Sequence, residues 1–346
     1  MKTNDKKFIN GYEVVVQAAL DAGAEAMYGY PITPTCEILS GWANSGKICL
    51  QTEDEIAAGF AVCGAVLAGQ KAFSASAGPG HILLQDSFSM AEAMRLPFVM
   101  IIGQRGGPSS GTVIYSQQEV TLACYGGNGE GLRLVYSPST IEELYILTRR
   151  AFNESWKYRF PAVVLTDGFT LKTRGVIDFE KINKIENVPA HALVPEDKIV
   201  HWQNIYTFEE DLYQELQNAK TDFDNIAPEI VGAEEVEASD AEILLVAHGI
   251  VALSAKEAVV ELRSRGIKIG LFRPITLRPF PKQALDKVAG AKNIKKIVVI
   301  ESSMGQFARI VRDELAPEID KSFDYLQYPG VGIEMDEIIS QIEKLK

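Results

Sequence analysis

The sequence predicts an α/β protein made of two successive units, each built around a mainly parallel sheet. Over residues 1–170 of the 346-residue chain, helical and strand patterns alternate at the spacing typical of such sheets. Residues 97–103 form an almost continuous apolar run, which is typical of a parallel strand buried on both faces. A second alternation begins at residue 241, and the chain is long enough to bury two cores.

The elements of the first unit follow in order. We expect Asn10 to cap the first helix, with Glu13 closing a capping box and Gly23 ending the helix. Pro31 and Pro34 keep the loop after the next strand extended. The later elements are expected as strands at 26–30, 47–52, 72–76, 97–103 and 161–167, and as helices at 54–68, after Gly80 up to 94, and at 140–157.

A polar stretch separates the two units. Domain boundaries are expected at 1–180 for the first unit, 181–240 for an acidic and polar connector, and 241–346 for the second unit. The connector should contain one short helix near 208–219. The second unit is expected to contain strands at 243–247, 268–272 and 297–300 and helices at 253–265, 282–288 and 306–315.

Composition restricts the class of protein. Apolar residues make up 47% of the chain and charged residues 23%, as in a globular protein that dissolves in water. A net charge of −12 argues against nucleic acid or an anionic membrane as partner. Apolar runs are strand-sized, and no secretory signal is recognisable, so we expect a cytoplasmic protein. The four cysteines lack metal-ligand spacing, and no metal site is predicted from them.

Three candidate site residues each follow a predicted strand: Thr33, Glu55 and Arg105. Ligands of parallel α/β sheets bind beyond the carboxyl ends of the strands, so we expect these side chains to converge there.

Glu55 is the candidate acid. Asp54 can serve as the helix cap, which leaves the Glu55 carboxylate to face a helix rich in alanine and glycine. Apolar surroundings should raise its pKa and suit proton exchange with a heteroaromatic ring. The alternative is a carboxylate that only complements the helix dipole.

The other candidates also allow two interpretations. Arg105, before a glycine-rich stretch, could clamp a substrate carboxylate or pair with a surface acid. Thr33, between two prolines, could present its hydroxyl or belong to a plain turn. The turn at 76–80 (Ser-Ala-Gly-Pro-Gly) resembles a weak phosphate cradle, and His81 beyond it could be catalytic or simply hydrogen-bonded.

Two glycine-containing segments remain. The stretch at 125–131 (Tyr-Gly-Gly-Asn-Gly-Glu-Gly) is expected to be mobile, with a lid or an interface as its role. His248 and Gly249 are interpreted as a structural strand-to-helix turn, because no dinucleotide fingerprint surrounds them.

Four motifs together resemble a known family. They are 30–34 (Tyr-Pro-Ile-Thr-Pro), 53–55 (Glu-Asp-Glu), 76–80 (Ser-Ala-Gly-Pro-Gly) and 104–111 (Gln-Arg-Gly-Gly-Pro-Ser-Ser-Gly). In order and interval they resemble the α subunit of 2-oxoacid:ferredoxin oxidoreductases. The resemblance extends to 273–281 and so covers nearly the whole chain. The stretch at 125–130 is most similar to the 2-oxoglutarate branch, whereas 112–116 (Thr-Val-Ile-Tyr-Ser) departs from it and leaves branched-chain 2-oxoacids open.

The resemblance implies a fold, a coenzyme and partners. The fold is a thiamine-type pyrimidine-binding domain followed by a transketolase C-terminal-like domain. The Gly-Asp-Gly and Asn-Asn signature of thiamine enzymes is absent, Asp167-Gly168 being the nearest match, so this chain looks like half of an enzyme. A β subunit would carry Gly-Asp-Gly, Mg²⁺ and a [4Fe-4S] cluster and share thiamine pyrophosphate with this chain. Small γ and ferredoxin-like δ subunits, ferredoxin and coenzyme A complete the implied partners.

The resemblance also implies roles. Glu55 would hydrogen-bond the aminopyrimidine ring as the catalytic residue, and Thr33 and Arg105 would bind the 2-oxoacid. The implied coenzyme-contacting residues are Tyr30, Pro31, Ile32, Glu55, Ser76 and Gly78.

Two other functions remain open at this point. One is a non-catalytic assembly subunit, which would tolerate Thr33→Ala and Arg105→Ala. The other is a subunit of a split thiamine-dependent decarboxylase, which would need neither coenzyme A nor ferredoxin.

Overall fold

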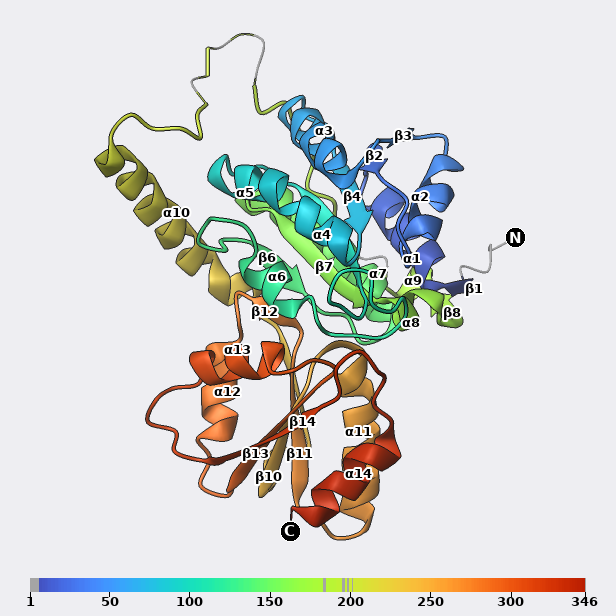
Figure 1. The fold of residues 1–346 in the computed structure, drawn as a ribbon, viewed down its shortest axis with the longest axis vertical. Coiled ribbons are helices and arrows are strands. Elements are labelled where there is room, and N and C mark those ends of the chain that lie inside the picture. The colour runs from blue at the N-terminus through green and yellow to red at the C-terminus, as the bar shows by residue number, and fades with distance from the viewer. Residues whose placement is uncertain (1–5, 183–184, 195–196, 198, 201, 346) are drawn as a thin grey trace.

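The protein consists of two α/β units joined end to end (Figure 1). The structure is a computed structural model that describes residues 6–182, 185–194, 197, 199–200 and 202–345. The carboxyl-terminal unit lies below the first in the view of Figure 1, and the junction between them is formed by loops and one shared strand.

The first unit is built on a seven-stranded sheet with the order β12-β6-β7-β5-β4-β2-β3. All its neighbouring pairs are parallel except β12–β6. Its strands are β2 (Ala26–Gly29), β3 (Ile48–Gln51), β4 (Ala72–Ser76), β5 (Val99–Gln104), β6 (Leu134–Tyr136), β7 (Ala162–Asp167) and β12 (Thr276–Arg278). The central strands β4, β5 and β7 are fully buried, and for β5 this confirms the expectation from its apolar sequence.

Helices cover both faces of this sheet. The first helix begins with the predicted capping box, in which the Asn10 side chain and the Glu13 carboxylate each accept the other residue's main-chain N–H. The helices are α1 (Gly11–Asp21), α2 (Cys36–Ala43), α3 (Glu55–Leu67), α4 (Pro79–Leu83), α5 (Gln85–Ala93), α6 (Val120–Tyr125), α7 (Ile141–Tyr158), α8 (Gly168–Lys172) and α9 (Phe179–Ile182). A small ribbon of β1 (Lys6–Asn10) and β8 (Arg174–Asp178) completes the unit.

The second unit is built on a five-stranded sheet with the order β14-β13-β10-β11-β9. The strands are β9 (Ala233–Val236), β10 (Ile243–Val246), β11 (Ile269–Pro274), β13 (Lys296–Glu301) and β14 (Ser322–Gln327), of which β9 is antiparallel. Helices α11 (Gly249–Ser264) and α14 (Met335–Lys344) share one apolar core, and α12 (Lys282–Ala289) and α13 (Gln306–Glu314) contribute to another.

The segment between the units is more structured than the sequence predicts. Its helix, α10 (Glu209–Ile230), continues well past the expected end at 219, because Phe223 and Ile230 are buried against the first unit. The acidic run at 234–237 is not connector. Glu234 lies on the edge strand β9, where its carboxylate pairs with Arg273 at 2.9 Å. Because this edge strand carries charged side chains, it lacks the alternation of apolar and polar residues by which strands are predicted.

Hydrogen bonds join the two units at a buried junction. The Gln117 side chain donates to the His248 carbonyl at 2.8 Å and accepts the Ser302 N–H at 3.0 Å. The Ser137 hydroxyl lies 2.8 Å from Nδ1 of His248, the residue that precedes α11. Burial lowers the pKa of His248 to about 3, so this ring is neutral. The interpretation of His248 as a structural turn residue is therefore supported.

Two further observations concern the part of the chain that the structure describes. No helix there has the length and apolar character needed to cross a bilayer. No group of three or more His, Cys, Asp or Glu side chains there is arranged to hold a metal ion.

Candidate active site

The loops after neighbouring strands meet at one edge of the first sheet. Strands β5, β4, β2 and β3 lie side by side in that order, and their carboxyl ends lead to Arg105, Gly78, Thr33 and Glu55 respectively. The strand ends that carry the candidate residues are therefore adjacent, as parallel topology predicts.

Glu55 is the first residue of α3 and is 5% exposed. Asp54 caps the helix by accepting the Ala57 N–H at 2.8 Å, so the Glu55 carboxylate is not needed for the cap. Burial raises the pKa of the Glu55 carboxyl and the charge of Asp54 adds to the rise, whereas a main-chain hydrogen bond and the charge of Arg105 oppose it.

The Glu55 carboxylate lies directly against Gly80. A Cβ atom at position 80 would lie 2.2 Å from Oε1 of Glu55 and 2.3 Å from Oγ of Ser76. Gly80 is therefore required for a carboxylate and a hydroxyl to approach the same turn. No spacing rule in the sequence indicates this contact.

Arg105 is 6% exposed and lies between the loops of β2 and β4. Its Nη1 donates to the main-chain carbonyl of Thr33 at 2.6 Å. A Cβ atom on Gly78, which has a φ of 52°, would lie 2.6 Å from Arg105 Nε. Thr33 thus contacts Arg105 through its backbone, while its side chain is exposed.

Glu119, which no sequence motif indicates, lies just before α6 and is 5% exposed. Its Oε1 accepts the N–H groups of Gly78 and Arg105, each at 3.0 Å. Its Oε2 lies 2.8 Å from Nδ1 of the fully buried His81. His81 is therefore hydrogen-bonded inside the protein, as the second interpretation held.

The turn at 76–80 does not act as a phosphate cradle. The Gly78 N–H is donated to Glu119, and the Gly80 N–H is donated to the Ala77 carbonyl at 3.1 Å. Both donors that the weak motif would offer to a phosphate are therefore occupied.

Buried polar atoms without a hydrogen bond lie at the ends of the strands beside Glu55. Among the described residues they include Ser76 Oγ, Gln104 Oε1 and Arg105 Nε. A buried polar group without a partner is costly, so such a set indicates a polar ligand. With the Glu55 carboxylate, which can bond a ring nitrogen, these residues fit the aminopyrimidine end of thiamine diphosphate.

The remaining predicted contact residues lie at the surface beside this edge. Tyr30 is 39% exposed, Pro31 is exposed and Ile32 is partly exposed. In a single chain they are open to solvent rather than enclosed in a pocket.

The glycine-rich loop after α6 (125–131) is hydrogen-bonded to the rest of the protein, although its composition predicts a mobile loop. Buried Arg133 donates to the Gly126 carbonyl at 2.7 Å and pairs with Glu92 at 3.0 Å. Arg278, at the end of β12, donates to the Gly131 carbonyl at 2.7 Å. The two arginines hold the loop from both ends, a constraint that local composition does not reveal.

Asp167-Gly168, the nearest match to Gly-Asp-Gly, has a structural role. The Asp167 carboxylate caps α8 by accepting the Thr170 N–H at 2.8 Å and its hydroxyl at 2.9 Å. Burial raises the pKa of Asp167 to about 6, although the bonds from Thr170 oppose the rise.

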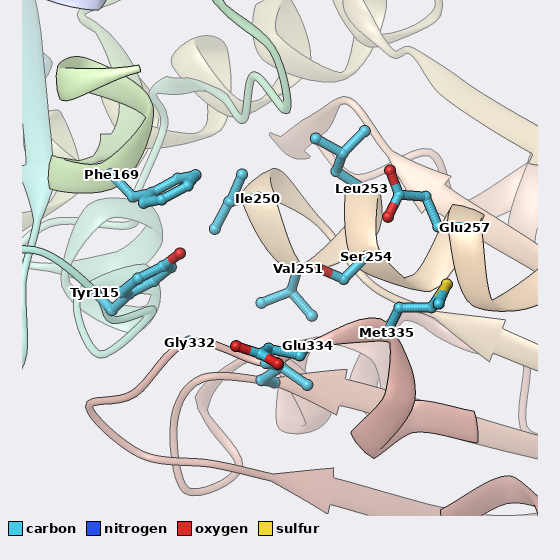
Figure 2. Close-up of a pocket in the computed structure, with 11 residues that line it drawn as sticks. Tyr115, Phe169, Ile250, Val251, Leu253, Ser254, Glu257, Gly332, Glu334 and Met335 are labelled. Carbon is cyan, nitrogen blue, oxygen red and sulfur yellow. The ribbon is translucent and has the colours of Figure 1, made fainter. Parts of the chain in front are cut away.

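A cavity of about 450 Å³ lies at the junction of the units rather than at Glu55 (Figure 2). The stacked rings of Tyr115 and Phe169, with centroids 4.9 Å apart, form one side of it. Helix α11 and the segment before α14 form the other side. Because the cavity is lined by neither Glu55 nor Arg105, we do not include it in the candidate site.

The fold and the site together are those of a thiamine-diphosphate-binding α/β protein. The family described as pyruvate flavodoxin/ferredoxin oxidoreductase, thiamine diP-bdg, matches residues 17–243. Pyruvate:ferredoxin oxidoreductase core domain II matches residues 241–338. The chain therefore belongs to the 2-oxoacid:ferredoxin oxidoreductase family, which confirms the family inferred from the motifs.

Relatives with two different substrate names are equally similar in sequence. 2-Oxoglutarate synthase subunit KorA of Methanocaldococcus jannaschii is 32% identical over 332 residues, covering 87% of this chain and 89% of that protein. Ketoisovalerate oxidoreductase subunit VorB of Methanothermobacter thermautotrophicus is also 32% identical, covering 88% and 89%.

Solved structures support the fold class. A chain of the 2-oxoglutarate:ferredoxin oxidoreductase from Magnetococcus marinus aligns with a TM-score of 0.87 at 24% identity, covering 99% of this chain and 66% of that one. A split-gene transketolase aligns with a TM-score of 0.60 at 13% identity, covering 96% of each chain. The predicted pairing of a thiamine-type domain with a transketolase-like domain is confirmed.

Proposed function

We propose that this chain provides the aminopyrimidine side of the active site in a CoA-acylating 2-oxoacid:ferredoxin oxidoreductase that acts on 2-oxoglutarate. The observation that carries the proposal is the buried Glu55 carboxylate beside Arg105, at neighbouring strand ends of a thiamine-type sheet.

The coenzyme side consists of Glu55, Ser76, Gly78 and the exposed residues 30–32. When bound, thiamine diphosphate supplies the carbon nucleophile and the electron sink for decarboxylation. Glu55 would hold a proton at a pyrimidine ring nitrogen, a task suited to a carboxyl group whose pKa is raised by burial. The Ser76 hydroxyl, which has no partner among the described residues, would complete the polar contacts.

The substrate side consists of Arg105 and Thr33. Arg105 Nη1 is already bonded to the Thr33 carbonyl, and its buried Nε has no partner among the described residues. That free N–H would orient the carboxylate of the 2-oxoacid. A single oriented contact suits a reaction in which this carboxylate leaves as CO₂.

An exposed apolar surface beside Glu55 supports a partner subunit. On α3, Ile56 is 40% and Phe60 is 38% exposed, and on the adjacent α4 Ile82 is 57% and Leu83 is 40% exposed. Such a patch beside a half-open coenzyme site is typical of an interface. We assign to it the β subunit, which would hold the diphosphate, Mg²⁺ and the iron–sulfur cluster. Small γ and δ subunits, ferredoxin and coenzyme A would complete the system.

Two features support 2-oxoglutarate as the substrate: the stretch at 125–130 and the similarity to proteins named 2-oxoglutarate synthase. One observation favours a branched-chain 2-oxoacid as a second candidate. In the loop after Arg105, Val113 is 41% and Ile114 is 36% exposed, and apolar side chains there would suit a branched aliphatic substrate.

The test is purification of the tagged chain with its partner subunits, without oxygen, followed by measurement of ferredoxin reduction. We expect thiamine-dependent and CoA-dependent turnover, with kcat/KM at least about tenfold higher for 2-oxoglutarate than for 2-oxoisovalerate. The reverse preference would establish the second candidate. CO₂ release that needs neither CoA nor ferredoxin would instead indicate a split decarboxylase.

A further inference from the structure

We propose that Glu119 is a positioning residue that holds the coenzyme-side turn and the substrate-binding arginine in one fixed geometry. The inference rests on the proposed function, because it assigns Glu119 a role in that same site. Glu119 would act on the reaction only through Arg105 and Gly78.

One carboxylate oxygen of Glu119 links two loops that follow different strands. Oε1 accepts the Gly78 N–H from the loop after β4 and the Arg105 N–H after β5, each at 3.0 Å. Because both donors share one oxygen, their separation is fixed by hydrogen-bond geometry. At 5% exposure little water competes for these charge-assisted bonds.

His81 holds the other oxygen. Its Nδ1 lies 2.8 Å from Oε2 of Glu119, and the ring is fully buried. The Glu119 carboxylate has two main-chain donors on one oxygen and can only accept at the other. Nδ1 of His81 therefore carries a hydrogen and donates a hydrogen bond to Oε2. The ring thereby fixes the rotation of the Glu119 carboxylate.

These hydrogen bonds set the distance between the two groups that bound the Arg105 guanidinium, the Thr33 carbonyl and Gly78. On one side Nη1 is bonded to the Thr33 carbonyl at 2.6 Å, and on the other Nε lies against Gly78, whose added Cβ would be 2.6 Å away. A shift of the Gly78 turn would therefore move the atom that faces the substrate. A displacement of about 1 Å in an active site can cost about 100-fold in rate.

The experiment compares Glu119→Ala, Glu119→Gln and Glu92→Ala in the assembled complex. Glu92 is a matched control, because its carboxylate is 8% exposed and also accepts a main-chain N–H, from Glu130, but it serves the glycine-rich loop. Measurements are kcat and KM for 2-oxoglutarate, thiamine diphosphate affinity by fluorescence titration, and the melting temperature.

We expect Glu119→Ala to lower kcat/KM by about 100-fold, mainly through a higher KM. Glu119→Gln should cost about tenfold, because its neutral amide oxygen binds the two N–H groups less strongly than a carboxylate does, and because His81 must move its hydrogen to Nε2 before Nδ1 can accept the new NH₂ group. Glu92→Ala should lower the melting temperature with kcat and KM within about twofold of the wild type.

The outcomes separate the two proposals. If the wild-type complex turns over no 2-oxoacid, the proposed function is refuted. If the wild type is active, Glu119→Ala complex with wild-type kcat and KM overturns the role of Glu119, and so does an equal KM change in Glu92→Ala. Should Glu119→Ala not fold, unchanged kinetics in Glu119→Gln would overturn it instead.

Discussion

Gly80 and Glu55 are in such close contact that any side chain at position 80 would displace the Glu55 carboxylate. A Cβ atom there would lie 2.2 Å from the Glu55 carboxylate, a separation that non-bonded heavy atoms do not adopt. Two residues at the starts of separate helices are thus mutually dependent, and the position of the buried acid depends on the absence of a side chain 25 residues later in the sequence.

The first prediction follows from this contact. Gly80→Ala should displace the Glu55 carboxylate and lower kcat of the complex by about 100-fold, while the subunits still assemble. Gly232→Ala is the control, because its Cβ would be at ordinary contact distance, 3.5 Å from Ile275. Ferredoxin reduction and gel filtration provide the readout. Full activity in Gly80→Ala would show that the Glu55 position is not set by this contact.

The second prediction concerns the buried charge of Glu55. Its raised pKa means that the folded chain binds this proton more tightly than the unfolded chain, so ionised Glu55 opposes folding at neutral pH. Glu55→Gln should therefore melt above the wild type at pH 8, and the difference should shrink as pH falls toward about 4.3. Activity should be lost at every pH.

Thermal melts of the full chain from pH 4.5 to 8 measure the effect of Glu55→Gln. Glu53→Gln, at an exposed carboxylate, is the control and should leave the melting curve unchanged. A Glu55→Gln variant that melts below the wild type at pH 8 would show that the contacts of the buried carboxylate outweigh the cost of burying its charge, which would contradict the raised pKa.

The third prediction separates Thr33 from Arg105. Arg105→Lys loses the Nε donor and the bond to the Thr33 carbonyl, so KM for the 2-oxoacid should rise by about tenfold or more. Thr33→Ala retains that carbonyl and should preserve the position of Arg105. Any rise in KM for Thr33→Ala therefore measures a direct contact of its hydroxyl with substrate. Steady-state kinetics on both complexes supply the comparison, and a wild-type KM in Arg105→Lys would refute the clamp.

The sequence was sufficient to predict five of the seven strands of the first sheet, all but β6 and β12, and the edge at which the site lies. Apolar runs such as 97–103 specify buried parallel strands, and the topology of such sheets then brings Thr33, Glu55 and Arg105 together. This inference needed no knowledge of loop conformation, because it depended only on which residue follows each strand.

Contacts made by loops could not be predicted in this way. Glu119 follows the long loop at 106–118, and nothing in the local sequence pattern distinguishes it from a surface acid. Strand β12 lies in the sequence range of the second unit but pairs with β6 of the first sheet. A period of two indicates a strand without indicating its partner, so the shared sheet was also missed.

The fourth prediction uses the neutral histidine at the junction of the units. Burial lowers the pKa of His248 to about 3, well below the value of about 6.5 expected in the unfolded chain. Below about pH 6.5 the unfolded chain takes up a proton at this ring, whereas the folded chain does not until about pH 3. The stabilisation that the neutral His248 ring gives to the folded chain is therefore complete above about pH 6.5. As the pH falls toward 3, the free energy of unfolding decreases by up to about 1.4 kcal/mol per pH unit. His248→Gln should melt below the wild type at pH 8, and the gap should narrow at pH 4.5. His191→Gln, at an exposed ring, is the control, and a constant gap for His248→Gln would contradict the prediction.

The fifth prediction concerns the apolar surface beside Glu55. Phe60 is 38% exposed on α3, one helical turn from Ile56, and a carboxylate there would lose its hydration on contact with another subunit. Phe60→Asp should therefore abolish co-purification of the β subunit while this chain remains folded by circular dichroism. Val260→Asp is the control, because Val260 is 65% exposed on α11 of the second unit, and it should leave assembly intact. Normal recovery of the β subunit with Phe60→Asp would show that this apolar surface is not the interface.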